Sequence, residues 1–585
     1  MSILGVDVGG TFTDAAFLAR DGSLRTAKVP TSANQAESVL AAAEAVGARP
    51  GAVDRFRHGT TVATNALLER RGARTAFVAT EGFEHLLHLR RQNRAHLYRL
   101  CRQHPAPLVP LERCVGVRER MGPEGVIVPL ELASLPALDE VEAIAVCLLH
   151  SYRHPEHERA VAAELRRRHP GAHVVASHES APEFREYERA STTAVDAYLG
   201  PVLAAYLRDL AASCERAGLP EPLVMRSSGG VVTVAEAAAH AAWALLSGPA
   251  AGAVGARFAA RRAGAGNVIA FDMGGTSTDV CAIVNGEVRR EHERMVGGLP
   301  VRLPTVAVHT VGAGGGSIVR RDVGGAIRVG PESAGADPGP VCYGRGGTTP
   351  TVTDANLALG RLPERLPGGL ELDARAAQRA LGDLDPAAVV AVVEAELVRA
   401  LRVVSVEQGL DPRDFALVAF GGAGPLHACS LADELGIGRV LVPAAAGMLS
   451  ALGLVVGDER RDTVRAFVGL LEDAGELPPD GEADLRYAGQ SYELTVPLGD
   501  GLVERFHTAH EARNGYADPD RPIELVAVRT ADVVPGPSHL VAQSHKVVEA
   551  RGPQLVELEG ATCWVPSGWE GRSDADGTLV LERRA

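Results

Sequence analysis

The hydrophobic positions of this chain form short runs that alternate with segments of helical periodicity. In the first 190 residues, the apolar runs at 75–79, 143–149 and 173–176 predict strands. Apolar positions three and four residues apart over 35–46 and 60–70 predict helices. This alternation of strand and helix indicates an α/β fold.

The same alternation continues to about residue 457. A long helical pattern over 188–218 contains Pro201, which we expect to kink or divide the helix. The apolar run 416–420 predicts a strand that leads through a Gly-rich turn into a helix over 426–435. An acidic stretch with several Pro and Gly residues at 471–482 is typical of a linker.

These patterns divide the chain into three expected units. Residues 1–190 and 191–465 form two α/β lobes, and residues 483–585 form a mostly β C-terminal domain. In this last unit, alternating patterns such as 492–496 and 579–581 predict strands.

One pattern, D-x-G-G-T-x-T-D, occurs twice, at 7–14 and at 272–279. Each copy follows an apolar run and precedes a second apolar stretch, an Asx-Gly pair and a further short stretch. Both contexts predict strand, Gly turn, strand, Asx-Gly turn, strand. Two such hairpins, one in each half of a duplicated domain, can hold a polyphosphate from two sides.

The residue types of the repeat suit phosphate and magnesium chemistry. Paired glycines let backbone N–H groups approach phosphate oxygens, and hydroxyl groups add donors. The candidate nucleotide-binding residues are Gly9, Gly10, Thr11, Thr13, Asp14, Gly274, Gly275, Thr276, Ser277 and Thr278. Asp7 and Asp272, at strand ends, are candidate ligands of a hydrated Mg²⁺. Together with Asp279 they are the candidate catalytic residues.

Two further Gly clusters, at 311–317 and 420–425, follow the second copy of the repeat. Taken alone, each is equally compatible with a ligand loop and with a tight packing turn. Beside two phosphate hairpins, a nucleotide-binding role is the better interpretation, on the adenosine side for the second cluster. The residues concerned are Gly314, Gly315, Gly421, Gly422 and Gly424.

Several polar residues outside the repeats are candidates for substrate binding. A histidine and hydroxyl groups at 58–61 lie at a strand-to-helix junction, where capping is an equally good explanation. The preferred interpretation of the Arg- and His-rich stretch 85–104 is a solvated face, and the alternative is a contact with substrate or a partner. The candidates are His58, Thr60, Thr61, Arg91, Gln92, Arg94 and His309.

Composition excludes several classes of function. A net charge of −14 argues against a nucleic-acid or anionic-membrane partner. The only lysines are Lys28 and Lys546, and neither lies in the G-K-[ST] context of a Walker-A loop. The eight cysteines show no CxxC spacing, so we expect reduced, mostly buried thiols. The alanine-rich stretch 241–256 is too short and interrupted for a membrane span, and the start of the chain shows no signal sequence, so we expect a cytoplasmic protein.

The chain resembles the hydantoinase A / 5-oxoprolinase family, which includes ATP-handling subunits of N-methylhydantoinase and acetone carboxylase. Its doubled repeat is similar to the phosphate loops of the actin, sugar-kinase and heat-shock ATPase superfamily. The similar segments are 7–14, 58–69, 91–94, 226–230, 247–252, 272–279, 309–317, 336–344, 353–356, 420–427, 484–490 and 565–569.

The resemblance implies two RNase H-like lobes of the actin-like ATPase fold, with ATP and Mg²⁺ as cofactors. It implies ATP-dependent opening of a cyclic amide, of the hydantoin or 5-oxoproline type, by phosphorylation of the amide oxygen. An acetone carboxylase-like subunit that acts on a ketone is the first alternative, and a non-catalytic actin-like ATP switch is the second. A hydantoinase B-like second subunit is the expected partner, and a homo-oligomer is left open.

Overall fold

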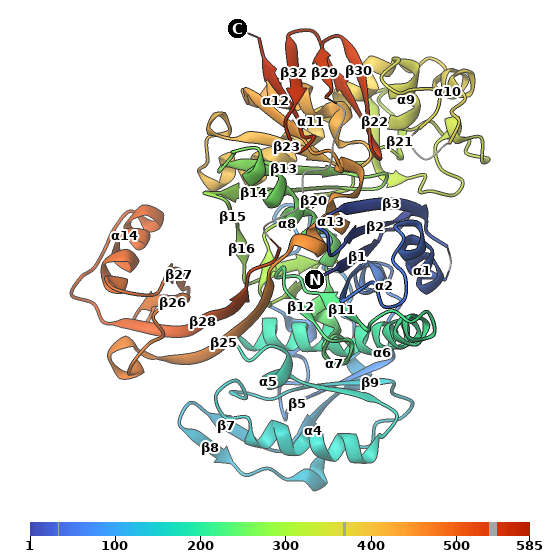
Figure 1. Cartoon of the computed structure of the whole chain (residues 1–585). Helices are drawn as coiled ribbons and strands as arrows, with labels where there is room; N and C mark the ends of the chain where they lie inside the picture. Colours follow the sequence, from blue (N-terminus) through green and yellow to red (C-terminus); the bar gives the residue numbers. More distant parts are fainter. Residues whose placement is uncertain (33, 367–369, 538–546, 585) are drawn as a thin grey trace.

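The computed structural model describes residues 1–32, 34–366, 370–537 and 547–584, and Lys546 lies outside these ranges. The fold is a mixed α/β arrangement in which two main sheets lie one above the other, with a smaller sheet below and a curved β unit at the side (Figure 1). Within the described ranges, no helix combines the length and apolar character of a membrane span.

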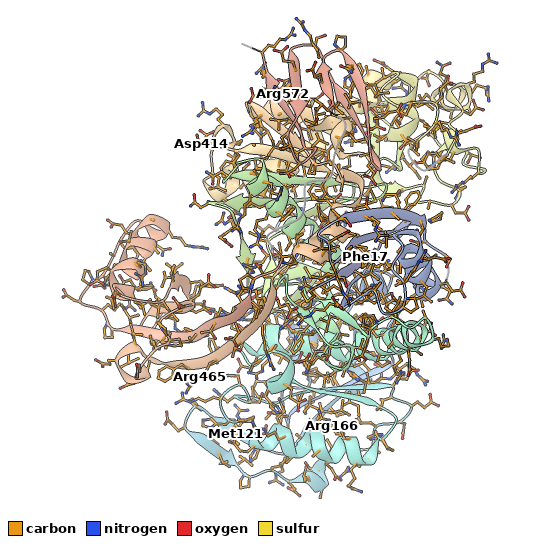
Figure 2. All side chains as sticks on the ribbon, viewed as in Figure 1. Phe17, Met121, Arg166, Asp414, Arg465 and Arg572 are labelled. Carbon is orange, nitrogen blue, oxygen red and sulfur yellow. The ribbon has the colours of Figure 1, made fainter. Side chains whose placement is uncertain are left out.

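The first main sheet has the strand order β12-β11-β4-β1-β2-β3. The central strand β1 is antiparallel to β2 and parallel to β4, and its apolar side chains are fully buried. Phe17 of β2, labelled in Figure 2, packs among the same buried residues as helix α1. The bounds are β1 Ile3–Val8, β2 Phe12–Leu18, β3 Leu24–Pro30, α1 Gln35–Ala45, β4 Arg55–Thr60, α2 Val62–Leu68, β11 Pro222–Met225 and β12 Val231–Val232.

The second main sheet repeats this topology. Its strands β15-β14-β13-β23-β24 run in the same relative directions as β3-β2-β1-β4-β11 of the first sheet. Strands β33, β32 and β29 extend this sheet beyond β24, and β20 pairs with β14. The duplicated α/β fold predicted from the repeat is therefore confirmed. The bounds are β13 Val268–Met273, β14 Thr278–Val284, β15 Glu287–Val288, β20 His309–Val311, β23 Ala416–Phe420, β24 Arg439–Val442, β29 Glu549–Arg551, β32 Trp569–Ser573 and β33 Leu579–Arg583.

Two helices, α8 (Ser247–Arg262) and α13 (Leu449–Val456), cross between the two main sheets (Figure 1). Their backbones meet because glycines stand at the crossing. A Cβ built on Gly453 would lie 1.9 Å from the carbonyl oxygen of Ala251, and one on Gly255 would lie 2.4 Å from that of Leu449. Side chains larger than hydrogen are therefore excluded at these two positions.

A four-stranded parallel sheet, in the order β10-β9-β5-β6, lies inside the expected 1–190 unit as a separate layer. Helices α4 (Glu156–Arg168) and α6 (Glu186–Arg216) pack on it, and Arg166 of α4 is labelled in Figure 2. Its strands are β5 Thr75–Thr80, β6 Cys114–Val117, β9 Ala143–Cys147 and β10 His173–Ala176. Contrary to one expectation, Pro201 does not divide α6, because residues 187–200 are buried between this sheet and the first lobe.

The chain between 459 and 534 forms a separate curved sheet, and Arg465 on β25 marks it in Figure 2. Its order is β25-β28-β26-β27, and helix α14 closes a small apolar core against it. The bounds are β25 Glu459–Leu470, β26 Glu482–Tyr487, β27 Leu494–Pro497, α14 Leu502–Asn514 and β28 Ile523–Val534. The expected unit 483–585 is therefore split between two sheets, since its last strands join the second main sheet.

Buried ion pairs attach this curved sheet to the rest of the molecule. Arg529 of β28 donates to Glu183 at 2.6 Å and to Asp484 at 2.8 Å. Arg302 donates to the same Glu183 at 2.8 Å and to Glu493 at 3.1 Å. These side chains are at most 10% exposed, so the pairs are largely shielded from water and salt.

Candidate active site

The two repeats form two hairpins with the same register. Asp7 lies opposite Asp14 across β1 and β2, and Asp272 lies opposite Asp279 across β13 and β14. In each turn the first glycine donates its N–H to a carbonyl three residues further on. The two bonds are Gly9 N to Phe12 O and Gly274 N to Ser277 O, both 3.0 Å. The repeated sequence thus gives the same local geometry twice.

The Asp7 carboxylate lies in a close-fitting niche of the first lobe. A Cβ on Gly59 of β4 would be 2.4 Å from Asp7 Oδ1, and a Cβ on Gly248 of α8 would be 3.5 Å from Oδ2. Asp7 Oδ1 is buried and has no hydrogen-bond partner within the described residues. Loss of water and the nearby Asp14 raise the pKa of Asp7 to about 7, although Lys28 opposes the shift.

The Asp272 carboxylate occupies the equivalent niche of the second lobe. A Cβ on Gly421 would be 2.3 Å from Asp272 Oδ1, and a Cβ on Gly252 would be 3.5 Å from Oδ2. Loss of water, then Asp279 and then Asp7, raise the pKa of Asp272 to about 8. The carboxylates of both hairpins therefore repel one another across the gap between the lobes.

Repelling carboxylates with an unpartnered oxygen fit a hydrated Mg²⁺, which binds through one or two carboxylates and keeps waters or phosphate oxygens as its other ligands. Asp7 and Asp272 are these two carboxylates. In the part of the chain that the structure describes, no cluster of three or more His, Cys, Asp or Glu side chains is arranged to hold a metal. A site with two carboxylates suits a cation that arrives with a phosphate ligand.

The second carboxylates of the two hairpins have different partners. Asp14 Oδ1 accepts from Lys28 Nζ at 2.5 Å, which is an ion pair. Asp279 Oδ1 accepts from the Thr310 hydroxyl at 2.5 Å, which is a neutral donor. Burial raises the pKa of both carboxylic acids. The two hairpins are alike in backbone but different in charge.

A cavity of about 1000 Å³ opens between the hairpins. The first turn contributes Gly10, and the second contributes Thr276 and Ser277. A Cβ on Gly10 or Gly275 would meet no atom within 4 Å, so both turn apices are open. The start of α2, the start of α8 and the segments 289–297 and 307–310 complete the wall. This volume is sufficient for a nucleotide or for a phosphoryl donor beside a small ring.

The two additional Gly clusters lie against the second hairpin. Gly315 N donates to Gly274 O at 3.0 Å, and Gly316 N donates to Gly275 O at 2.7 Å. From the other cluster, Ala423 N donates to Met273 O at 2.9 Å. Gly314 and Gly315 therefore lie against the second turn, and Gly421 and Gly424 lie against the end of β13, while a Cβ on the predicted Gly422 would meet no atom within 4 Å.

Two hydroxyl groups of the repeat are not available to a phosphate. Thr13 and Thr278 are fully buried, and Thr278 donates to the Ala313 carbonyl at 2.5 Å. Thr13 shares a hydrogen bond of 3.0 Å with Thr31. In a strand, alternate side chains face opposite sides, so these threonines point into the lobes and stabilise the hairpins.

Among the expected substrate residues, Thr60, Thr61 and His309 line the cavity, but His58 does not. His58 is fully buried, with Nδ1 3.1 Å from Val6 O and Nε2 2.8 Å from the Tyr206 hydroxyl. Burial lowers its pKa to about 4, so the ring is neutral. Its place in the sheet makes it a core residue behind the cavity wall.

The expected Arg91, Gln92 and Arg94 are exposed in the segment that follows α3 (Leu86–Leu89) and are not part of the cavity wall. Arg91 makes a bidentate ion pair with Glu188 of α6, at 2.8 and 2.6 Å. The solvated-face interpretation of this segment therefore agrees with the structure.

The sequence interpretation missed the charged side of the cavity. Arg289, Arg290, Glu291, Arg294 and Thr310 all line it. The first four belong to a dense charged run at 289–294, which was a visible signal. Such runs usually mark solvated faces, and only the fold brings this one to face the second hairpin.

Comparisons with known proteins agree with this geometry. Residues 3–169 match the family model for the hydantoinase/oxoprolinase N-terminal region, and residues 189–463 match the hydantoinase/oxoprolinase model. Caprolactamase subunit alpha of Pseudomonas jessenii is 35% identical over 97% of this chain and 90% of its own length. The acetone carboxylase beta subunit of Xanthobacter autotrophicus is 32% identical over 78% of this chain and 70% of its own length.

A solved structure extends the likeness to three dimensions. The crystal structure of the ATP-dependent caprolactamase from Pseudomonas jessenii superposes with a TM-score of 0.85 at 31% identity, over 99% of this chain and all of that chain. The mixed α/β fold with a β-rich C-terminal region is shared. This chain belongs to the hydantoinase/oxoprolinase family.

Proposed function

We propose that this chain is the ATP-binding subunit of an enzyme that opens a cyclic amide by phosphorylating the amide oxygen. The observation that carries the proposal is the pair of register-matched hairpins, whose turns line one cavity of about 1000 Å³. Family membership and the printed name of the ATP-dependent caprolactamase support the use of ATP. The lobes 1–190 and 191–465 would each contribute one hairpin.

The chemistry addresses the low reactivity of an amide. The amide oxygen attacks the γ-phosphorus of ATP, the bond to the bridging oxygen breaks, and ADP leaves. Water then adds to the carbon and loses a proton, the ring nitrogen gains a proton, and the C–N bond breaks to leave an acyl phosphate. A second water releases phosphate and the free carboxylate. The protein contributes positioning and charge stabilisation.

Within this scheme, Asp7 and Asp272 would hold Mg²⁺ through their niche oxygens. When bound, the ion would supply positive charge to the phosphate oxygens of ATP. The open turns at Gly10 and Gly275 would present backbone N–H groups to the same oxygens. Asp279 would lie beside the transferring phosphoryl group, where its hydrogen bond from Thr310 holds the carboxylate in place.

The likeness to the acetone carboxylase beta subunit favours a second candidate, the phosphorylation of a ketone-derived enolate before carboxylation. Both candidates use the same nucleotide cavity. Since these relatives are named as subunits, we also propose a hydantoinase B-like partner that completes the reaction. The cytoplasmic location expected from the sequence stays a prediction.

The test is to follow phosphate release and ring opening separately, with the chain alone and with a hydantoinase B-like protein encoded next to it. Lactams, hydantoins and ketones are screened with ATP and Mg²⁺. We expect the chain alone to bind ATP in a Mg²⁺-dependent manner and the pair to open a lactam or a hydantoin. Turnover of ketones with bicarbonate alone would favour the second candidate. Absence of nucleotide binding would contradict both.

A further inference from the structure

Arg294 is a cation on the cavity wall whose ion pair within the described part of the chain is no closer than 3.9 Å, although the charge of Asp279 also favours its charged form. Its side chain is 13% exposed, and it forms its ion pair with Glu291 at 3.9 Å, which is long. Its Nη2 also donates to the Thr310 hydroxyl at 3.4 Å. By contrast, the buried Arg302 pairs with three carboxylates, at 2.8 to 3.1 Å. Burial lowers the pKa of Arg294, as expected for a guanidinium that has lost water without full compensation.

The neighbours of Arg294 fix its direction. The Thr310 hydroxyl donates to Asp279 at 2.5 Å, so its lone pairs remain for the Arg294 guanidinium. His309, which precedes Thr310 on β20, also lines the cavity. Burial, and then the charge of Arg294, lower the pKa of His309, which favours a neutral ring. A cation and a hydroxyl therefore meet beside the second hairpin.

The backbone that carries Arg294 is also held firmly. Arg294 opens the two-stranded hairpin of β17 (Arg294–Val296) and β18 (Leu299–Val301), where it lies opposite Val301. Arg302, which follows Val301, forms buried ion pairs with Glu183 and Glu493. The backbone position of Arg294 on the cavity wall is therefore fixed.

We propose that Arg294, positioned by Thr310, binds the substrate oxygen that receives the phosphoryl group, beside the second phosphate hairpin. A guanidinium stabilises an oxygen that becomes anionic and can hold the resulting phosphate in a bidentate manner. This assignment rests on the proposed function, because it names the substrate side of the same cavity.

The experiment compares Arg294→Gln and Arg294→Lys with Arg465→Gln, which makes the same charge change at an exposed position of the curved sheet that is not part of the cavity wall. Inorganic phosphate is titrated calorimetrically onto protein saturated with ADP and Mg²⁺, so the measurement needs no known substrate. We expect Arg294→Gln to weaken phosphate binding by at least about tenfold, Arg294→Lys to retain part of it, and Arg465→Gln to change it little. Affinity for ADP stays within about threefold in all three variants because the hairpins are untouched.

Substrate-stimulated phosphate release gives the second readout. Arg294→Gln should lose on the order of 10²-fold, the usual scale for removing one positioned donor. Equal phosphate affinity in Arg294→Gln and Arg465→Gln would overturn the assignment, as would a parallel loss of ADP affinity, which would put Arg294 in the nucleotide site. If wild-type protein binds phosphate through Arg294 but no cyclic amide or ketone stimulates turnover, the proposed function fails while the anion site stands.

Discussion

The substitution Gly59→Ala tests whether the exact position of the Asp7 carboxylate governs turnover. Gly59 lies beside Asp7 in the parallel pairing of β1 and β4. The added methyl group would be 2.4 Å from Asp7 Oδ1, while ordinary contact begins at 3.4 Å. Because the pairing of β4 with β1 holds the Gly59 backbone in place, the carboxylate is the group that must move, by about 1 Å.

A displacement of about 1 Å at a reacting centre costs on the order of 10²-fold in rate. Overpacking of this kind lowers the free energy of unfolding by about 1–3 kcal/mol, which a folded chain of this size can tolerate. We therefore expect a folded Gly59→Ala protein with a modestly lowered Tm and a turnover reduced on the order of 10²-fold. The loss of activity should exceed what the loss of folded protein explains.

The assay is phosphate release at saturating ATP and Mg²⁺, paired with thermal unfolding of the same samples. Gly266→Ala is the matched control, since a Cβ at that exposed position meets no atom within 4 Å. It should change neither property. A folded Gly59→Ala protein with wild-type turnover would refute the reasoning, because the Asp7 carboxylate could then move without consequence.

Three further predictions concern other parts of the molecule. Asp7→Asn and Asp272→Asn should each lower ATP turnover on the order of 10²-fold with the Tm kept, and near-wild-type phosphate release by either would remove that residue from the two-hairpin scheme. His58 has a folded pKa of about 4 against 6.5 unfolded, so its contribution to stability, about 3 kcal/mol, is present above pH 6.5 and lost as the pH falls towards 4. The free energy of unfolding, measured with urea at pH 7.5 and at pH 5, should fall less in His58→Gln than in the wild type. An equal fall in the two proteins would contradict the prediction. Arg529→Met should lower the free energy of unfolding by on the order of 3 kcal/mol, because Glu183 loses one of its buried partners. Adding Glu183→Gln should recover part of that loss. An unchanged free energy of unfolding in the single variant would mean that the ion pairs contribute little to stability.

The elements that local sequence determines were predictable. The Asp-to-Asp register of each hairpin follows from a short Gly turn between two apolar strands, and the Asx-Gly turn at Asn285 has the left-handed backbone that such a pair favours. The duplicated sheet order follows from the duplicated motif. Helices over 35–46 and 60–70 were found as α1 and α2, because their apolar periodicity is also the packing face.

The elements that depend on distant partners were not predictable. Strand β33 has the alternation of an ordinary strand, and nothing in it specifies that it pairs with β24 instead of the curved sheet. His58 has the polarity of a site residue, yet its neighbours in the sheet bury it. Arg294 belongs to a charged run whose place beside β20 arises from pairings made only in the folded chain.

The two hairpins share their sequence and register but not their charge, and this asymmetry bears on where the chemistry takes place. In the first lobe, Lys28 forms an ion pair with Asp14, so these two side chains together carry no net charge. In the second lobe, Asp279 accepts a hydroxyl hydrogen bond, and Arg294 on the cavity wall lies near enough for its charge to favour the carboxylate. Charge that develops during phosphoryl transfer is stabilised best by groups that are not already paired. We therefore expect the second hairpin, with Arg294 beside it, to act on the group that the nucleotide transfers.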